Sequence, residues 1–241
     1  MTTNLLTASV PLLHRFGRHP LVISAQAVTL LSCATLGALE LAGVHTGRPT
    51  SEMLAARRTQ ADHAQAVADT CYRRIEQGDA AGALPDCRQA VCLSPSSTRA
   101  RKNLGLALLR TKKPSEAKAV LETAVQLFPD SPDRDEAHFL LGNLYQLKGE
   151  NNWAKHQYRL ALAANPSHHQ AHYGLARASE TSGQTADAIE EYYAVLRLRP
   201  GYRPAYTYLI PLLRRYGRLN QVQELQNQRE QQKLDAAWMG P

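Results

Sequence analysis

The sequence predicts an all-α protein, an α-solenoid of about five helix-turn-helix repeats that follows a single transmembrane helix. Three observations lead to this prediction. Prolines recur at a regular spacing over most of the chain, and small residues recur in register with them. A charge-free apolar stretch precedes these repeats. The repeats and the apolar stretch together account for most of the 241 residues.

The proline spacing defines the repeat length. Pro95, Pro129, Pro166 and Pro200 follow one another at 34, 37 and 34 residues. The longer interval contains a short insertion around Asp130 and Asp133. A proline ring cannot continue a helical turn, so each of these residues is expected to follow the second helix of a repeat.

Small and apolar residues occupy fixed positions within this period. A leucine column is formed by Leu104, Leu141, Leu175 and Leu209. A small-residue column follows it at Gly105, Gly142 and Ala176, with Ile210 in the last repeat. A turn column is formed by Gly78, Gly149, Gly183 and Gly217, with Lys112 in place of glycine in one repeat. Small residues allow two helices to approach closely, and glycine ends a helix by adopting a positive φ.

These columns predict four complete helix pairs, at 99–111/115–127, 135–148/151–164, 168–182/185–198 and 203–216/219–235. The first repeat is less regular. Its first helix is expected to begin near Ser51 and to run to Gln77, whereas Gly82 and Pro85 should kink or delay its second helix. In the last repeat we expect Pro211 to interrupt the first helix, and the polar second helix to act as a terminal cap.

The combined columns resemble the tetratricopeptide repeat. The resemblance covers residues 64–234, with repeats at about 64–97, 98–131, 135–168, 169–202 and 203–235, a helical connector at 45–63 and a tail at 235–241. It implies a concave face, lined mainly by the first helix of each pair, that binds an extended peptide or a helix of a partner protein.

Helical periodicity projects eight side chains toward this groove: Tyr72, Arg99, Lys102, Phe139, Asn143, Tyr173, Arg177 and Arg214. The mixture is basic and aromatic. Cations suit an acidic partner or a free carboxylate, rings suit apolar anchors and an amide suits a peptide backbone. The alternative interpretation is that the basic residues are only solvated surface. The Lys/Asn/Arg clamp with which some family members bind chaperone tails is not reproduced, so we expect no chaperone ligand.

The membrane anchor is predicted over residues 21–44, after a short N-terminal segment at 1–20. Residues 21–39 carry no charge, and 19 helical residues span roughly 28 Å, close to the hydrocarbon thickness of a bilayer. Arg15 and Arg18 precede the stretch and Arg48 follows it, which favours an N-terminus in the cytoplasm, whereas a count that extends to Arg57 and Arg58 favours the opposite orientation. Two alternatives stay open, namely lipidation at Cys33 and a cleaved presequence.

Catalytic and cofactor motifs are absent from the sequence. It contains no glycine-rich phosphate loop, no His-Glu-x-x-His and no Cys-x-x-Cys, so we expect no enzyme, no cofactor and no small-molecule substrate. His168, His169 and His172 form the one histidine cluster, but no acid or cysteine is placed to complete a metal site. We interpret them as surface residues at a helix start.

Three cysteines, Cys71, Cys87 and Cys92, lie in the first repeat. Cys71 takes the small position of one helix and Cys87 faces it from the next, so these two are placed to form a disulfide in an oxidising compartment. The alternative is that all three are buried thiols.

The net charge of +7, from 28 basic and 21 acidic residues, is spread along the chain rather than clustered, which argues against a nucleic-acid partner. The expected function is a membrane-anchored scaffold that binds proteins and assembles complexes in the bacterial envelope. The expected location is the inner membrane, with the repeats in the periplasm. Two alternatives remain: an accessory subunit docked through its transmembrane helix in a membrane enzyme or a photosynthetic or respiratory complex, and a lipid-anchored factor for pilus or secretion assembly.

Overall fold

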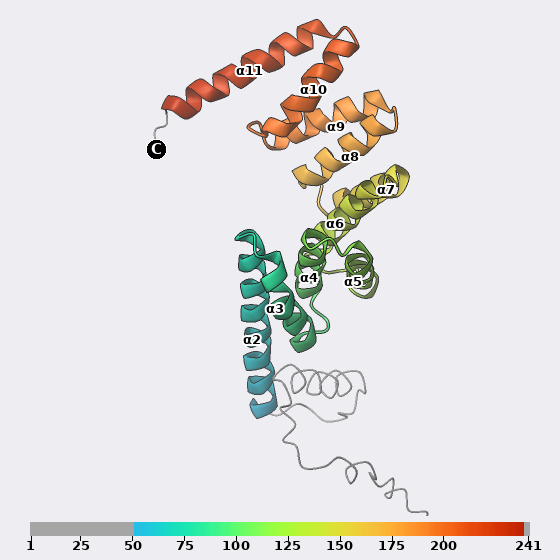
Figure 1. Cartoon of the computed structure of the whole chain (residues 1–241). Helices are drawn as coiled ribbons and strands as arrows, with labels where there is room; N and C mark the ends of the chain where they lie inside the picture. Colours follow the sequence, from blue (N-terminus) through green and yellow to red (C-terminus); the bar gives the residue numbers. More distant parts are fainter. Residues whose placement is uncertain (1–50, 239–241) are drawn as a thin grey trace, which may run out of the picture. The chain divides into compact units, whose positions relative to one another are not determined.

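The computed structural model describes residues 51–238, and within this range it contains ten α-helices and no strand (Figure 1). The helices are α2 (Ser51–Glu76), α3 (Ala80–Leu93), α4 (Thr98–Arg110), α5 (Pro114–Leu127), α6 (Arg134–Leu147), α7 (Asn151–Ala164), α8 (His169–Thr181), α9 (Thr185–Leu198), α10 (Arg203–Arg215) and α11 (Leu219–Trp238). All belong to one compact unit. The predicted all-α class is confirmed, and the helix bounds lie close to those predicted.

Successive helices pack as five antiparallel pairs, which stack on one another along the chain (Figure 1). Each second helix also contacts the first helix of the next pair. In addition, the first helices contact one another across repeats, α2 with α4, α4 with α6 and α6 with α8. This repeated stacking of helix hairpins is the predicted α-solenoid, and it aligns the first helices along one face.

Left-handed backbone ends the first helix of every pair. The four turn glycines have positive φ, between +70° and +87°, and Lys112 adopts a φ of +60° at the equivalent place. In one such turn the backbone N–H of Gln184 donates to the carbonyl of Ser179 at 2.9 Å, the bond that closes a helix with a left-handed residue. The predicted role of the turn column, including its lysine, is confirmed.

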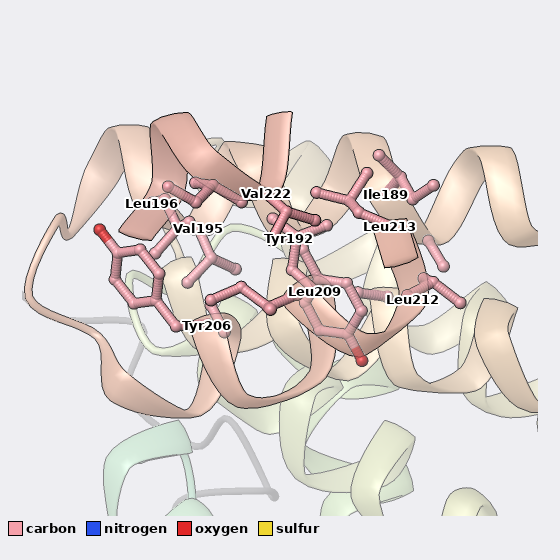
Figure 2. Packing of buried hydrophobic residues seen from close by; sticks show 14 residues of the cluster. Ile189, Tyr192, Val195, Leu196, Tyr206, Leu209, Leu212, Leu213 and Val222 are labelled. Carbon is pink, nitrogen blue, oxygen red and sulfur yellow. The ribbon is translucent and has the colours of Figure 1, made fainter. Parts of the chain in front are cut away.

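The small-residue columns receive large side chains from the second helices. A Cβ on Gly105 would stand 2.6 Å from the side chain of Leu121, and a Cβ on Gly142 would stand 2.5 Å from the Tyr158 ring. The C-terminal pairs enclose the largest buried cluster, in which Tyr192 of α9 lies among Leu209, Leu213 and Val222 (Figure 2). The core is therefore a series of contacts between neighbouring helices, as stacked repeats require.

The predicted delay of the second helix in the first repeat and the predicted interruption at Pro211 are both wrong. Helix α3 is not delayed, because it begins at Ala80 directly after the turn, and the Asp79 carboxylate caps it by accepting from the N–H of Gly82 at 2.9 Å. Helix α10 is not interrupted, because Pro211 lies within one continuous helix. Each proline removes a single helical hydrogen bond, and the packing of the flanking turns holds the helix together.

Within residues 51–238, no helix is both long enough and apolar enough to cross a membrane. The predicted anchor at 21–44, the segment at 1–20, Cys33 and the last residues of the tail lie outside the described residues.

Candidate interaction groove

Two adjoining clefts run along the first helices of the repeats. The N-terminal cleft has a volume of about 630 Å³ and is lined from α2, α4, α6 and α8 by Asp69, Tyr72, Glu76, Arg99, Lys102, Asn103, Leu106, Arg110, Glu136, Phe139, Leu140, Asn143 and Gln170. The tyrosine cleft, of about 380 Å³, is lined by Phe139, Asn143, Gln146, Gln170, Tyr173, Gly174, Arg177, Tyr202 and Tyr208. Because Phe139, Asn143 and Gln170 line both clefts, the two form one continuous groove.

The structure brings seven of the eight predicted groove residues to this face. Tyr72, Arg99, Lys102, Phe139 and Asn143 line the N-terminal cleft. Tyr173 and Arg177 line the tyrosine cleft, together with Phe139 and Asn143.

Arg214 lines neither cleft. It follows Tyr208 by six residues, and at about 100° per residue this turns it away from the direction of the tyrosine side chain. Arg214 is therefore the one predicted groove residue that the structure does not bring to either cleft.

The charges in the N-terminal cleft are balanced and largely paired. Lys102 Nζ lies 2.8 Å from the carboxylate of Asp133, at the start of α6. Arg99 lies 3.8 Å from Asp69 and 3.9 Å from Asp133. Arg110 lies 3.6 Å from Glu76. The cleft is therefore lined by three basic and three acidic side chains, whereas the sequence projection described a basic and aromatic mixture and included none of the acidic residues.

Asn103 is a feature of the N-terminal cleft that sequence reasoning missed. Its side chain is buried, and its Nδ2 donates to the carbonyl of Ala68 in α2 at 3.1 Å. Its Oδ1 has no hydrogen-bond partner among the described residues. The one feature of the sequence that could have indicated its burial is its position directly before Leu104 in the leucine column.

Aromatic rings dominate the tyrosine cleft. The ring centre of Tyr173 lies 5.5 Å from that of Tyr202 and 6.1 Å from that of Tyr208. The guanidinium carbon of Arg177 lies 3.8 Å from the centre of the Tyr208 ring, a cation–π contact. Burial raises the pKa of Tyr173 to about 12, so its phenol stays protonated at neutral pH and can donate a hydrogen bond.

Asn143 is oriented from beneath the groove by Tyr158 of α7. The Tyr158 hydroxyl lies 2.8 Å from Oδ1 of Asn143 and 2.7 Å from Oε1 of Gln146. Burial raises the pKa of Tyr158 above its usual range, so the phenol keeps its proton. A phenol has one proton to donate, so one of the two amides must turn its NH₂ group toward the phenol oxygen. Both amides are thereby held at the groove surface.

A disulfide joins Cys71 of α2 to Cys87 of α3, with their Cα atoms 5.1 Å apart and both side chains buried. It links the two helices of the first repeat. Tyr72 and Glu76, which line the N-terminal cleft, lie within two turns of Cys71 on the same helix.

The three clustered histidines have different partners. His168 caps α8 by accepting from the N–H of Ala171 at 3.2 Å, and its other ring nitrogen lies 3.1 Å from Glu136. His172 pairs with Glu191 at 2.5 Å, and His169 packs against Tyr202. Within residues 51–238 no group of three or more His, Cys, Asp or Glu side chains is arranged to hold a metal ion.

The fold and the groove define a class of protein, the helical-repeat proteins whose aligned first helices form an open interaction surface. Two family models described as tetratricopeptide repeat match residues 74–138 and 139–203. The chain therefore belongs to the tetratricopeptide-repeat family.

Solved structures of similar fold agree with this assignment. PilF of Pseudomonas aeruginosa is 16% identical with a TM-score of 0.65, and the match covers 72% of this chain and 78% of PilF. A crystal structure of MamA is 21% identical with a TM-score of 0.58, covering 68% of this chain and 95% of MamA. MamA of Desulfovibrio magneticus RS-1 is 19% identical with a TM-score of 0.56, covering 69% and 96%. At these identities the likeness shows the fold alone. No curated protein matches the chain.

Proposed function

We propose that this protein is a non-catalytic scaffold that binds a partner protein through the groove formed by its two clefts. The observation that carries the proposal is the continuity of the groove along α2, α4, α6 and α8. Rings, amides and charged groups remain accessible along this face, as they do on surfaces that bind an extended peptide. The partner contributes an extended segment or a helix.

An acidic group on the partner fits the tyrosine cleft better than the N-terminal cleft. Arg177 is the one ionised side chain among the described residues that line the tyrosine cleft. In the N-terminal cleft, a partner carboxylate would have to compete with Asp69, Glu76 and Asp133 for the basic groups. We therefore place a partner carboxylate, from an acidic side chain or a free C-terminus, at Arg177.

We further propose that residues 21–44 anchor the protein in a bacterial inner membrane and that the repeats lie in the periplasm. The support is the charge-free sequence of 21–39, with Arg15 and Arg18 before it. The Cys71–Cys87 disulfide adds support, because disulfides persist mainly in oxidising compartments. A reporter that is active only outside the cytoplasm, fused to residue 241, should be active. A silent but expressed fusion would refute this orientation.

The groove is tested by site-specific photocrosslinking in the full-length protein in cells. A photoreactive amino acid replaces Tyr72 in one variant and Tyr202 in a second, one from each cleft. The matched control replaces Arg159, an exposed residue on the second helix α7. We expect the same partner to be attached at positions 72 and 202 and not at 159. Attachment only at 159, or at none of the three positions, would contradict the proposal.

A further inference from the structure

The tyrosine cleft has an unusual composition for a protein-binding surface. Among the described residues that line it there is no Asp or Glu, and there is no Leu, Ile, Val or Met. Its apolar surface comes from aromatic rings, and its polar groups are phenols, carboxamides and one guanidinium. A partner cannot insert an aliphatic side chain into an aliphatic pocket here, but it can lay a flat apolar surface against the rings.

The rings are held in place before any partner binds. The guanidinium of Arg177 lies 3.8 Å from the centre of the Tyr208 ring, and the buried ring of Tyr192 is parallel to Tyr208 within 5° at 6.4 Å. Tyr202 packs edge-on against His169 at 5.4 Å and against Tyr173 at 5.5 Å. Because these side chains are already ordered, little conformational entropy is lost when a ligand stacks on them.

The polar groups of the cleft suit a ligand that offers acceptors. Arg177 can only donate, and the phenol of Tyr173 is protonated. The amides of Gln146 and Asn143 face the Tyr158 hydroxyl, and at least one of them accepts from it through its carbonyl and therefore presents its NH₂ group as a donor to a ligand. A peptide segment that presents carbonyl oxygens and few N–H groups matches this set of donors. Proline-containing segments have this property, since proline has no backbone N–H.

We propose that the tyrosine cleft binds a proline-containing segment of the partner in the polyproline II conformation, with a pyrrolidine ring against Tyr202 and carbonyls toward Arg177 and the amides. Recognition of such segments by aromatic-lined grooves is an established mode of peptide binding, because the polyproline II helix is preformed and its flat faces stack on rings. The inference rests on the proposed groove function and names the chemistry of the partner for this half of the groove.

The direct test uses the full-length protein and a synthetic decaproline peptide with blocked ends, titrated by isothermal titration calorimetry. A glycine-serine peptide of the same length serves as the control ligand, because it is uncharged but not preformed. We expect saturable binding of decaproline and none of the control ligand. Equal binding of the two peptides, or no saturable binding of decaproline at millimolar concentration, would overturn the inference.

Three variants locate the binding site. Tyr202→Ala removes the ring on which the segment stacks, and Tyr208→Ala removes the ring that holds Arg177. Each should weaken decaproline binding about fivefold. Gln170→Glu places a carboxylate in the cleft at an exposed position, which does not disturb the packing, and should weaken binding by a similar factor. Gln228→Glu, at an exposed position on α11, is the matched control and should bind normally. Unchanged binding by Gln170→Glu in a folded protein would place the peptide elsewhere and overturn the inference.

The crosslinking experiment separates this inference from the proposed function. Mass spectrometry identifies which segment of the partner is attached at position 202. A proline-containing segment supports both proposals. A specific segment without proline retains the groove function and overturns the inference, whereas the absence of any groove adduct contradicts the function itself.

Discussion

The ring of Tyr158 lies so close to the backbone of Gly174 that a Cβ on this glycine would stand 2.5 Å from the ring carbon Cζ. A Cβ on Gly142 of α6 would also stand 2.5 Å from this ring. The ring of Tyr158, on α7, therefore packs against two glycine backbones, Gly142 of its own repeat and Gly174 of the next. Its hydroxyl reaches Asn143 and Gln146 at the groove, so the packing between repeats and the groove surface share one side chain.

Replacing Gly174 with alanine should destabilise the domain by about 1–3 kcal/mol, because the methyl group forces the buried ring of Tyr158 to move. The free energy of unfolding is measured by urea denaturation followed by circular dichroism. Gly201→Ala is the matched control, since nothing lies within 4 Å of a Cβ at that position. A similar, small effect of the two substitutions would show that the packing around the Tyr158 ring is looser than described.

Replacing Lys112 with glycine should stabilise the domain by about 1 kcal/mol. Lys112 is the one non-glycine residue with a positive φ among the described residues, at +60°, and the left-handed conformation is strained for a side chain with a Cβ. Gly149→Ala, in the equivalent turn with φ of +75°, should destabilise by a similar amount. The same denaturation measurement tests both, and a loss of stability in Lys112→Gly would be inconsistent with strain at this turn.

Removing the Cys71–Cys87 disulfide should lower the free energy of unfolding by about 3 kcal/mol, the value expected for a bond that closes a loop of 16 residues. The double variant Cys71→Ala/Cys87→Ala is preferable to a reductant, because it leaves other cysteines unchanged. Peptide mapping without reduction should first find the two cysteine peptides of the wild-type protein linked. Unlinked peptides would mean that the pair is reduced in the protein as isolated.

The repeating features of the fold could be predicted because they depend on local rules. Leu104 and its equivalents follow the helical period, and Gly78 and its equivalents supply a conformation that other residues rarely adopt. Lys112 could be assigned to a turn only through its register with those glycines. The effects of Pro85 on the start of α3 and of Pro211 on the continuity of α10 could not be predicted by a local rule. At both places, tertiary packing outweighs a single missing hydrogen bond.

The groove could be predicted only in part, because its chemistry depends on contacts between distant residues. The pairing of Lys102 with Asp133 joins α4 to the insertion before α6, and no spacing rule predicts it. Tyr202 lies outside the helices, where projection of helical periodicity does not apply. The burial of Asn103 follows from the approach of α2, which a single helix does not reveal.

The pH dependence of stability should carry a contribution from His172. Its hydrogen bond to Glu191 raises its pKa, and burial opposes this effect. A histidine with a raised pKa stabilises the folded state at pH values below its unfolded pKa, and this contribution is lost as the pH rises through the folded pKa. The difference in unfolding free energy between the wild type and His172→Gln should therefore be larger at about pH 5.5 than at about pH 8.5.

His169 provides a control, because its contribution to stability should change with pH in the opposite direction. Burial and the charge of Arg199 lower its pKa, so its contribution is lost as the pH falls. The difference between the wild type and His169→Gln should therefore grow with pH. If the stability differences of the two variants changed with pH in the same direction, the contact with Glu191 would not be what sets the pKa of His172.

Two basic residues of the groove, Arg177 and Lys102, should respond differently to truncation. Arg177 forms no ion pair with the described residues and lies against the Tyr208 ring, so its charge remains available to a partner. Arg177→Ala should weaken binding of the crosslinked partner about tenfold and change stability little.

Lys102 is bound to Asp133 at 2.8 Å in a half-buried pair, so Lys102→Ala should instead cost about 1.5 kcal/mol of stability. Arg159→Ala, on the outer helix α7, controls for a general loss of positive charge. The opposite result would be a Lys102→Ala variant that is as stable as the wild type but binds the partner more weakly than Arg177→Ala does. The partner's acidic group would then lie in the N-terminal cleft, where it would displace Asp133 from Lys102.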